Sequence, residues 1–435
     1  ILTFGSYYCY DIPGAMTVSL EDQYEISQAQ YSLLYTVYSI PNMILPLCGG
    51  WLIDRVFGFR LGGFVACSLV LLGQIIWAFG SFFVPHISAY YIALFGRFVF
   101  GLGGETLSVV QSGYCAKWFQ SKELALAFSI TLSFSRIGSA INFIVTPLVD
   151  GHLGGVTTVL WMGVGLCLVS LAACCGLMVL DFIGEKAKKG AGTFKVDENI
   201  QLSAVFKFPF SLYLVMLICV SFYVSIFSFI TISSAEFQTL WGYSELEANG
   251  VTSIPYILAA FVCPIGGLFV DKLGRHALWV LGSTFAMSYA HSLLVVAPEG
   301  AVLSPVIAMV IIGLSYTICA ASLWPSVALL IKGNELGTAY GTMTSVQNSG
   351  LAIAPFIVGL ITNDPNHPNY RIAEMFFTGC SAVSFLLCII LVVIDIRGAR
   401  KLTISAKELR DRTKNEEDKL LSINTDTDDM NDVYS

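Results

Sequence analysis

The second half of this chain repeats the first half. Residues 50–60, which read GWLIDRVFGFR, return as residues 267–275, which read GLFVDKLGR. A Glu-Leu pair follows each copy, and both pairs of matching segments are separated by a little over 210 residues. Arg136 stands thirteen residues after the first of these Glu residues, and Asn348 stands thirteen residues after the second. We therefore expect two related halves, of which only the first carries a charge at this position.

The composition requires a lipid environment for most of the chain. Hydrophobic residues make up 55% of the 435 residues and charged residues only 12%, whereas a soluble chain carries about 25% charge. Apolar stretches close to the ~20 residues of a membrane span recur six times before the polar stretch 182–208 and six times after it. The expected spans are 1–19, 31–53, 61–84, 88–115, 123–147, 156–181, 209–235, 249–270, 277–298, 302–331, 336–362 and 371–396. The sequence predicts an all-α polytopic membrane protein, with twelve transmembrane helices in two pseudo-symmetric six-helix bundles.

Changes in composition divide the chain into four regions. An N-terminal six-helix bundle is expected at residues 1–181, with a truncated first helix because Ile1 already lies inside an apolar stretch. A linker at 182–208 precedes a C-terminal six-helix bundle at 209–397. Residues 398–435 are polar, charged and poor in aromatic side chains, so we expect a disordered tail.

Lys and Arg gather on one side of the predicted spans. The short loops on that side, the linker and the tail carry the basic residues, whereas the opposite loops carry acidic residues and Arg371 at a helix mouth. Because Lys and Arg mark the cytosolic side of a membrane protein, both chain ends and the linker are expected in the cytosol. The sequence has no Asn-x-Ser/Thr acceptor, so no N-linked glycan is expected on the opposite face.

The repeated loop resembles a signature of the major facilitator superfamily. After the second span of each half, a Gly is followed by three residues, an Asp and a basic residue, here Asp54 with Arg55 and Asp271 with Lys272, and then by Arg275 in the second copy. We expect gating or structural roles for these residues, because an Asp can cap the following helix or face its N-terminal dipole. The resemblance implies two six-helix bundles that alternate access to a central site.

Further segments resemble the lysosomal dipeptide carriers of that superfamily. They are residues 4–11, 49–58, 95–105, 135–139, 323–325 and 336–341. The resemblance implies uniport of dipeptides from the lysosome lumen to the cytosol, with recognition of both peptide termini. It also implies a glycosylated single-span accessory subunit that accompanies the carrier in the lysosomal membrane. The first-helix motif of proton-coupled peptide carriers, two Glu followed by Arg-Phe, is absent from the sequence.

Two ionisable residues occupy matching depths in neighbouring spans. Glu105 precedes the centre of the turn near Gln120 by 15 residues, and Arg136 follows it by 16. At 1.5 Å per residue, both lie roughly 22 Å of helix from that turn. Arg136 can bind a carboxylate in a bidentate fork and Glu105 can accept an ammonium group, or the two can pair with each other. The resemblance implies that these two positions contact the dipeptide termini.

Two more charges fall inside the predicted spans, at Asp11 and Arg97. A charge in the hydrocarbon region costs about 2.5–3.5 kcal/mol and therefore suggests a function. Arg97 is expected about 12 Å of helix from Glu105, where it can act as a gate partner or extend its cation to the helix mouth. Asp11 lies near the outer end of the first span and can gate, cap a helix or bind substrate.

Uncharged residues complete the predicted substrate site. Trp324 precedes Pro325, which interrupts a helix and frees a backbone carbonyl in the membrane. The other candidates are Gln347, Asn348, Tyr223 and Tyr38, whose side chains are also of types that pack helices together. His291 is expected to pack against protein rather than against substrate.

The remaining motifs concern chemistry and sorting. No nucleotide-binding loop, zinc signature or hydrolase motif occurs, so we expect neither an enzyme, nor a metal or other cofactor, nor nucleic-acid binding. In the tail, Glu416, Leu420 and Leu421 match the acidic dileucine pattern that clathrin adaptors bind, which predicts sorting to lysosomes.

Two alternatives to a dipeptide uniporter follow from the same residues. A proton-coupled organic-anion or sugar carrier of the same superfamily would use Glu105 as its protonation site, although a sugar site does not require Arg136. A non-transporting receptor or scaffold has no need for two buried ions at matched depth.

Overall fold

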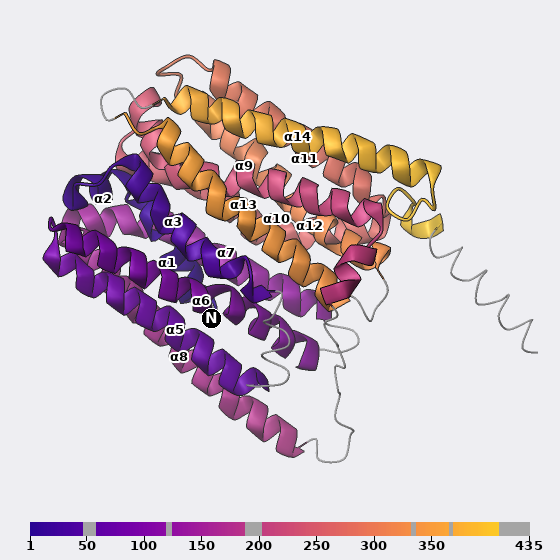
Figure 1. Cartoon of the computed structure of the whole chain (residues 1–435), viewed down its shortest axis with the longest axis horizontal. Coiled ribbons are helices and arrows are strands. Elements are labelled where there is room, and N and C mark those ends of the chain that lie inside the picture. Colours follow the sequence, from indigo (N-terminus) through magenta and orange to yellow (C-terminus); the bar gives the residue numbers. More distant parts are fainter. Residues whose placement is uncertain (47–57, 119–123, 188–201, 332–335, 365–368, 409–435) are drawn as a thin grey trace, which may run out of the picture.

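The computed structural model describes residues 1–46, 58–118, 124–187, 202–331, 336–364 and 369–408 (Figure 1). The first half of the chain forms the N-bundle, and the second half forms the C-bundle. The helices of the N-bundle are α1 (Phe4–Ala15), α2 (Thr17–Tyr24), α3 (Gln28–Asn42), α5 (Gly58–Gly80), η2 (Ser81–Phe83), α6 (Ile87–Trp118), α7 (Leu124–Leu153) and α8 (Gly155–Ala187). After η3 (Leu202–Lys207), the C-bundle consists of α9 (Phe210–Trp241), α10 (Glu245–Leu273), α11 (His276–Val296), α12 (Leu303–Leu330), α13 (Leu336–Ile361) and α14 (Tyr370–Arg397).

Ten of these helices, α5 to α14, are long and apolar enough to cross a membrane. The first predicted span corresponds to α1 and α2, which are separated by a break at Met16. The second corresponds to α3, and the rest of that predicted span lies partly outside the described residues. The predicted all-α polytopic fold is therefore confirmed.

Glycines set how closely two helices of the N-bundle approach. Gly73 on α5 faces Gly96 on α6, and a Cβ built on Gly73 would lie 2.4 Å from the backbone nitrogen of Phe100. A Cβ on Gly96 would lie 2.8 Å from the carbonyl oxygen of Gly73. Membrane helices pack through such close backbone contacts, because lipid supplies little hydrophobic driving force between them. A larger residue at either position would separate α5 from α6.

The two bundles meet tightly at the end of the molecule that carries α2, which we call the closed end. The Tyr31 hydroxyl of α3 donates a hydrogen bond to the carbonyl oxygen of Thr231 in α9, at 2.7 Å. Gly359 on α13 lies so near Ser32 on α3 that a Cβ on the glycine would be 2.4 Å from the serine Oγ. Toward the opposite end, α8 and α14 run apart from each other (Figure 1).

The chain beyond α14 packs back onto the C-bundle. The backbone N–H of Arg275 donates to the carbonyl oxygen of Ile404 at 2.8 Å, and the Ile404 side chain is buried. The Asp395 carboxylate accepts hydrogen bonds from the backbone N–H and the hydroxyl of Thr403, at 2.8 and 2.7 Å. The segment around 401–405 is thus held against the turn between α10 and α11, although the sequence places it in the tail.

Candidate functional site

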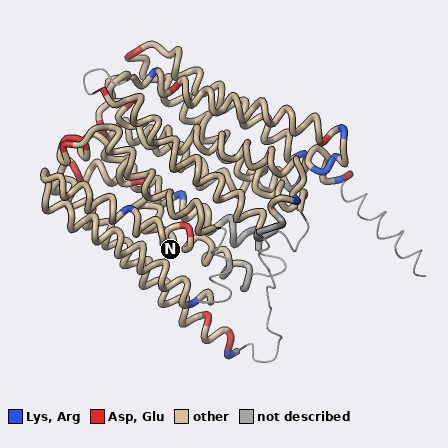
Figure 2. The backbone as a smooth tube through the Cα atoms, in the orientation of Figure 1, with Lys and Arg blue, Asp and Glu red and all other residues tan. Residues whose placement is uncertain are grey.

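Charged side chains concentrate toward the two ends of the helices, and few lie along their middle (Figure 2). Glu105 on α6 and Arg136 on α7 are interior charges that act on each other electrostatically. Among the ion pairs between described residues, which extend to 4.0 Å, none joins Glu105 to Arg136. Tyr7 of α1 neighbours both charges. The two side chains therefore lie near each other without an ion pair between them.

Aromatic rings from both bundles surround Arg136. Its guanidinium carbon lies 5.3 Å from the ring centre of Tyr7, 5.2 Å from that of Tyr316 on α12, and 5.6 Å from that of Phe227 on α9. A guanidinium group at these distances interacts with the electron-rich faces of the rings. The Nε atom of Arg136 is buried and has no hydrogen-bond partner among the described residues. Arg136 thus belongs to the N-bundle and contacts the C-bundle. Its Nε–H group is a hydrogen-bond donor without an acceptor among the described residues.

A row of aromatic residues leads from Arg136 into the C-bundle. Tyr316 lies edge-to-face against Tyr223, with ring centres 6.1 Å apart. The Tyr223 hydroxyl accepts a hydrogen bond from Trp324 Nε1 at 2.7 Å, and Tyr340 Oη donates to the carbonyl oxygen of Trp324 at 3.1 Å. The predicted residues Tyr223 and Trp324 are therefore connected to Arg136 through Tyr316.

Arg97 is a packing cation of the N-bundle and does not extend to a helix mouth. It is 1% exposed, and its guanidinium group donates to the carbonyl oxygens of Leu34, Cys9 and Tyr10 at 3.2, 3.3 and 3.3 Å. Because Pro13 has no N–H, it cannot donate to the Cys9 carbonyl four residues earlier. Arg97 supplies that missing donor and joins α1, α3 and α6.

Tyr38 lies between the packing cation and the predicted site. Its ring centre is 5.2 Å from the guanidinium carbon of Arg97. A Cβ built on Gly104 would lie 2.6 Å from the Tyr38 hydroxyl oxygen, and Glu105 interacts electrostatically with that hydroxyl. Tyr38, on α3, therefore packs next to Glu105 on α6.

Asp11 connects the two bundles on the side of the closed end. It is 2% exposed, and its Oδ1 accepts a hydrogen bond from the Tyr256 hydroxyl of α10 at 3.1 Å. The Tyr256 ring in turn stacks on Phe143 of α7, with centres 5.8 Å apart. Asp11 and Tyr256 thus form a hydrogen bond between the two bundles, and a gating role for Asp11 stays a prediction.

Gln347 and Asn348 face other partners. Asn348 Nδ2 donates to the carbonyl oxygen of Thr344 in its own helix at 3.0 Å. The Oε1 atom of Gln347 lies 3.9 Å from Cys219 Sγ, at the limit of a sulfur hydrogen bond. Neither of these two contacts connects Gln347 or Asn348 to Arg136.

The repeated loop and the sorting motif are only partly described. Lys272 and Arg275 are exposed at the turn between α10 and α11, and Arg275 has a left-handed backbone with φ of 55°. The positions that lie outside the described residues, or whose side chains are not described, are Asp54, Arg55, Asp271, Glu416, Leu420 and Leu421. Among the described residues, no group of three His, Cys, Asp or Glu side chains could hold a metal ion.

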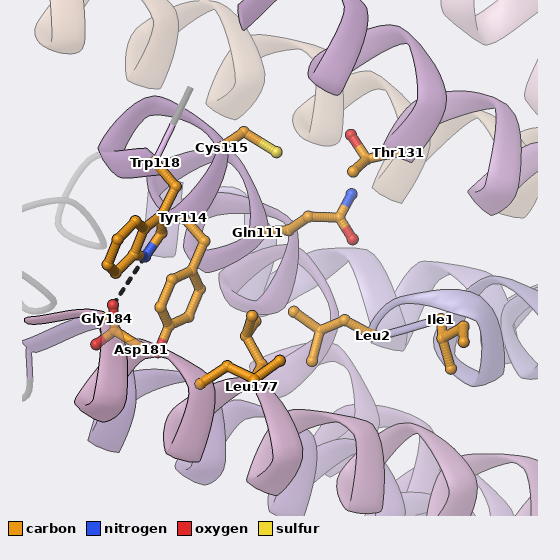
Figure 3. A pocket seen from close by; sticks show the side chains of 11 residues that line it. Ile1, Leu2, Gln111, Tyr114, Cys115, Trp118, Thr131, Leu177, Asp181 and Gly184 are labelled. Atoms are coloured by element: carbon orange, nitrogen blue, oxygen red, sulfur yellow. Dashed lines mark hydrogen bonds between the residues drawn. The ribbon is translucent and has the colours of Figure 1, made fainter. Parts of the chain in front are cut away.

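A cavity of about 440 Å³ opens elsewhere in the N-bundle (Figure 3). Its lining includes Leu2, Gln111, Tyr114 and Leu177, and none of the substrate-site residues predicted from the sequence. At one edge, Trp118 Nε1 donates to the Asp181 carboxylate at 2.9 Å (Figure 3). The cavity is mostly apolar and has no pair of opposite charges suited to a zwitterion.

The sequence did not identify Tyr7, Phe227, Tyr256, Tyr316 or Tyr340 as site residues. These five come from α1, α9, α10, α12 and α13, so that only the packing of the two bundles brings them together. Tyr316 could have been predicted from the sequence. It lies eight residues before Trp324 on the same helix, which is about two turns away on a similar face.

Comparison with known proteins gives a consistent family assignment. Residues 1–355 match the family model described as Major Facilitator Superfamily. The chain is 38% identical over 417 residues to the lysosomal dipeptide transporter MFSD1 of Homo sapiens, with 94% of this chain and 87% of that protein covered. It is 37% identical over 426 residues to the lysosomal dipeptide transporter MFSD1 of Danio rerio, with 95% and 89% covered.

Solved structures with little sequence similarity share the fold. A D-xylose-proton symporter superposes with a TM-score of 0.69 at 15% identity, over 90% of this chain and 95% of that one. A peptide transporter, POT, superposes with a TM-score of 0.66 at 14% identity, over 92% and 94%. At these identities the likeness concerns the arrangement of helices and not the substrate.

Proposed function

Because this chain belongs to the major facilitator superfamily, we propose that it carries dipeptides across the lysosomal membrane by alternating access. Its identity of 38% to a protein named as a lysosomal dipeptide transporter extends over 94% of the chain, which supports both the substrate class and the compartment. The residues between the bundles support the same substrate class.

The substrate would be recognised by its two termini. The observation that carries this proposal is the buried Nε atom of Arg136, which has no hydrogen-bond partner among the described residues and lies near Glu105. A dipeptide has a carboxylate and an ammonium group at fixed separation, so one end can bind Arg136 and the other Glu105. Charge-assisted hydrogen bonds of this kind contribute about 1.5–3 kcal/mol each.

The substrate side chains would contact the aromatic row. Rings offer flat apolar surfaces, and Tyr223 and Tyr316 retain hydroxyl groups that can bind polar substituents. This arrangement accepts side chains of several shapes, because no charged group in the row of Tyr316, Tyr223 and Trp324 selects among them.

Transport would run from the lumen to the cytosol as uniport. The distribution of basic residues in the sequence supports a luminal position of the closed end, and this conformation would then be the one from which a dipeptide leaves to the cytosol. The hydrogen bond between Asp11 and Tyr256 would break when the luminal side opens. We propose that the gradient of the dipeptide alone drives this cycle.

Sorting and protection would depend on further partners. The absence of any N-glycan acceptor in the sequence supports a glycosylated single-span subunit that covers the luminal loops. Glu416, Leu420 and Leu421 would bind clathrin adaptors from the cytosolic side. Replacement of both Leu420 and Leu421 by Ala should redirect the carrier to the plasma membrane, which surface labelling would detect.

The transport proposal is tested with purified carrier in proteoliposomes. Uptake of a labelled dipeptide should be competed by free dipeptides but not by their C-terminally amidated or N-acetylated forms. Glu105→Gln should reduce uptake by at least about 10-fold, since one charge-assisted hydrogen bond is lost. Glu299→Gln, an exposed acid at the closed end, serves as the matched control and should transport normally.

Two outcomes would contradict this function. Uptake of organic anions or sugars in place of dipeptides would favour the alternative carrier class. Uptake that a pH gradient drives in the absence of a dipeptide gradient would contradict uniport.

A further inference from the structure

A second group of ionisable side chains lies in the core of the C-bundle, outside the proposed substrate site. Glu236 comes from α9, His291 from α11 and Glu374 from α14, and all three side chains are fully buried. His291 Nδ1 lies 2.9 Å from Glu374 Oε2. The interactions of this group with other described residues connect it to neither Arg136 nor Glu105, and the proposed transport mechanism makes no use of these three residues.

The group contains two carboxylic acids, Glu236 and Glu374, but only one basic side chain, His291. His291 can pair with Glu374, whereas no donor group of the described residues donates to either carboxylate oxygen of Glu236. The hydrogen-bonding neighbour of Glu236 is the Glu374 carboxyl group, and two carboxyl groups can form such a bond only if one of them holds a proton. Glu236 and Glu374 are neighbours that act on each other electrostatically. Two ionised carboxylates side by side repel, and a buried carboxylate without a partner loses its hydration.

Arg371 is a permanent cation near both glutamates, but its hydrogen bonds go to other groups. Arg371 of α14 acts on both glutamates only through space, because its guanidinium group donates to the carbonyl oxygens of Leu294, Val295 and Ala297. It also lies over the Trp241 ring, 5.3 Å from its centre. Arg371 therefore caps the end of α11 and forms no ion pair with Glu236 among the described residues.

The remaining neighbours are apolar or only weakly acidic. The His291 ring lies 5.1 Å from the ring centre of Phe229 and 5.6 Å from that of Phe377. Tyr370, at the first residue of α14, is the other titratable neighbour of Glu236, and it also interacts with Glu21 of the N-bundle. These groups supply no positive charge that would offset an ionised Glu236.

We propose that Glu236, Glu374 and His291 form a proton-binding site in the core of the C-bundle, separate from the substrate site. In this site a bound proton neutralises Glu236, while His291 Nδ1 pairs with Glu374 Oε2. The ligand is the proton itself, and its role is to permit the packing of α9, α11 and α14.

The proton would enter from the closed end. Glu236 lies five residues before the end of α9, His291 five before the end of α11, and Glu374 four after the start of α14. At 1.5 Å per residue, all three are only about 6–8 Å from those helix ends. That this end faces the lumen rests on the proposed orientation, but the existence of the site does not.

The site makes stability depend on pH in a defined direction. At neutral pH the folded protein would keep a proton on Glu236, whereas the glutamates of an unfolded chain are ionised. Stability falls with rising pH wherever the folded state binds more protons than the unfolded state. The C-bundle should therefore be most stable in acid, which suits an acidic compartment.

The test measures thermal unfolding of the purified full chain in lipid nanodiscs at pH 5, 6, 7 and 8, at one scan rate. The wild type should lose about 5 °C or more in Tm between pH 5 and pH 8. Glu236→Gln replaces the protonated acid by a neutral amide of the same shape, so at least half of this pH dependence should disappear. Glu299→Gln, an exposed acid at the same end of the C-bundle, should follow the wild type.

The Tm measurements can contradict the proton-binding site whether or not the proposed transport function is correct. A wild-type Tm that does not change between pH 5 and pH 8 would overturn it, as would a Glu236→Gln protein with the full wild-type pH dependence. If Glu236→Gln does not fold, Glu236→Met takes its place, because it also removes the carboxyl group that binds the proton. A Glu236→Met protein with unchanged pH dependence would equally overturn the proposal.

Discussion

Arg136 and Asn348 occupy equivalent positions of the two repeated halves, and their surroundings differ. Arg136 contacts Phe227 and Tyr316 in the opposite bundle. Asn348 donates its amide hydrogen to the carbonyl oxygen of Thr344 in its own helix. At this position, therefore, the first half carries a charge that contacts the other bundle, and the second half carries an uncharged amide that bonds within its own helix.

The largest expected effect comes from making the first half resemble the second. Arg136→Asn should lower dipeptide uptake in proteoliposomes by about 100-fold, because it removes a charged hydrogen-bond donor worth about 2–3 kcal/mol. Arg397→Asn, an exposed arginine at the end of α14, is the matched control. Size-exclusion chromatography would distinguish a loss of folding in Arg136→Asn from a loss of transport. Uptake near the wild-type rate would show that the two halves do not differ in substrate recognition.

The second prediction compares Arg97 with Arg136, two arginines in the helices of the N-bundle. Arg97→Met should lower Tm by about 5 °C, because the carbonyl oxygens of Leu34, Cys9 and Tyr10 lose their donors. The dipeptide Kd of the folded fraction should stay within about threefold of the wild-type value. A variant with unchanged Tm and a large increase in Kd would assign Arg97 to binding instead of packing.

Several features of the molecule follow directly from the sequence. The helices follow from apolar stretches of sufficient length, and the closeness of Glu105 to Arg136 follows from their equal distances to one turn at a fixed rise per residue. The role of Arg97 could also have been deduced, since Pro13 leaves the Cys9 carbonyl without a helical donor. These inferences succeed because they depend on one helix or on two consecutive helices.

The rest of the site depends on contacts between the two bundles. Tyr316 and Phe227 are aromatic residues in apolar spans, as are many others in a chain with 13% aromatic residues. Only the packing of the C-bundle against α7 brings them to Arg136. The hydrogen bond of Asp11 could not be predicted for the same reason, because its partner Tyr256 lies in the other half of the chain.

The third prediction concerns the contact between the bundles near the closed end. Tyr256→Phe removes the hydrogen bond to Asp11 and should destabilise the closed end by about 1 kcal/mol. The population in which the bundles are separated at this end should therefore rise about fivefold. Labelling of a single cysteine introduced between the bundles at that end measures the change, with Tyr340→Phe as a control hydroxyl removal in the C-bundle. Unchanged labelling would mean that this bond does not hold the end closed.

A smaller effect is expected from the pH dependence of the closed end. Burial and the neighbouring Asp22 raise the pKa of Glu21 on α2 from 4.5 to about 8. The neutral carboxyl therefore contributes stability that is complete below pH 4.5 and is lost as the pH rises through about 8. Cysteine labelling at the closed end should increase about twofold between pH 7 and pH 9 in the wild type and should not change in Glu21→Gln. Equal increases in both proteins would assign the effect to another group.

The smallest effect is expected at the equivalent position of the second half. Asn348→Ala removes one hydrogen bond within a helix and should reduce stability by about 1 kcal/mol or less. Dipeptide uptake should stay within about threefold of the wild-type rate. A loss as large as that of Arg136→Asn would place Asn348 in the substrate site and remove the difference between the halves.

The central claim is that Arg136 binds the dipeptide carboxylate, and a double-mutant cycle tests it most directly. Binding of a dipeptide and of its C-terminally amidated form is measured by calorimetry on the wild type and on Arg136→Gln. The account predicts that amidation raises Kd by about 30-fold or more for the wild type and by less than about threefold for the variant. An equal penalty for amidation in both proteins would contradict the claim, because the carboxylate would then be bound by another residue.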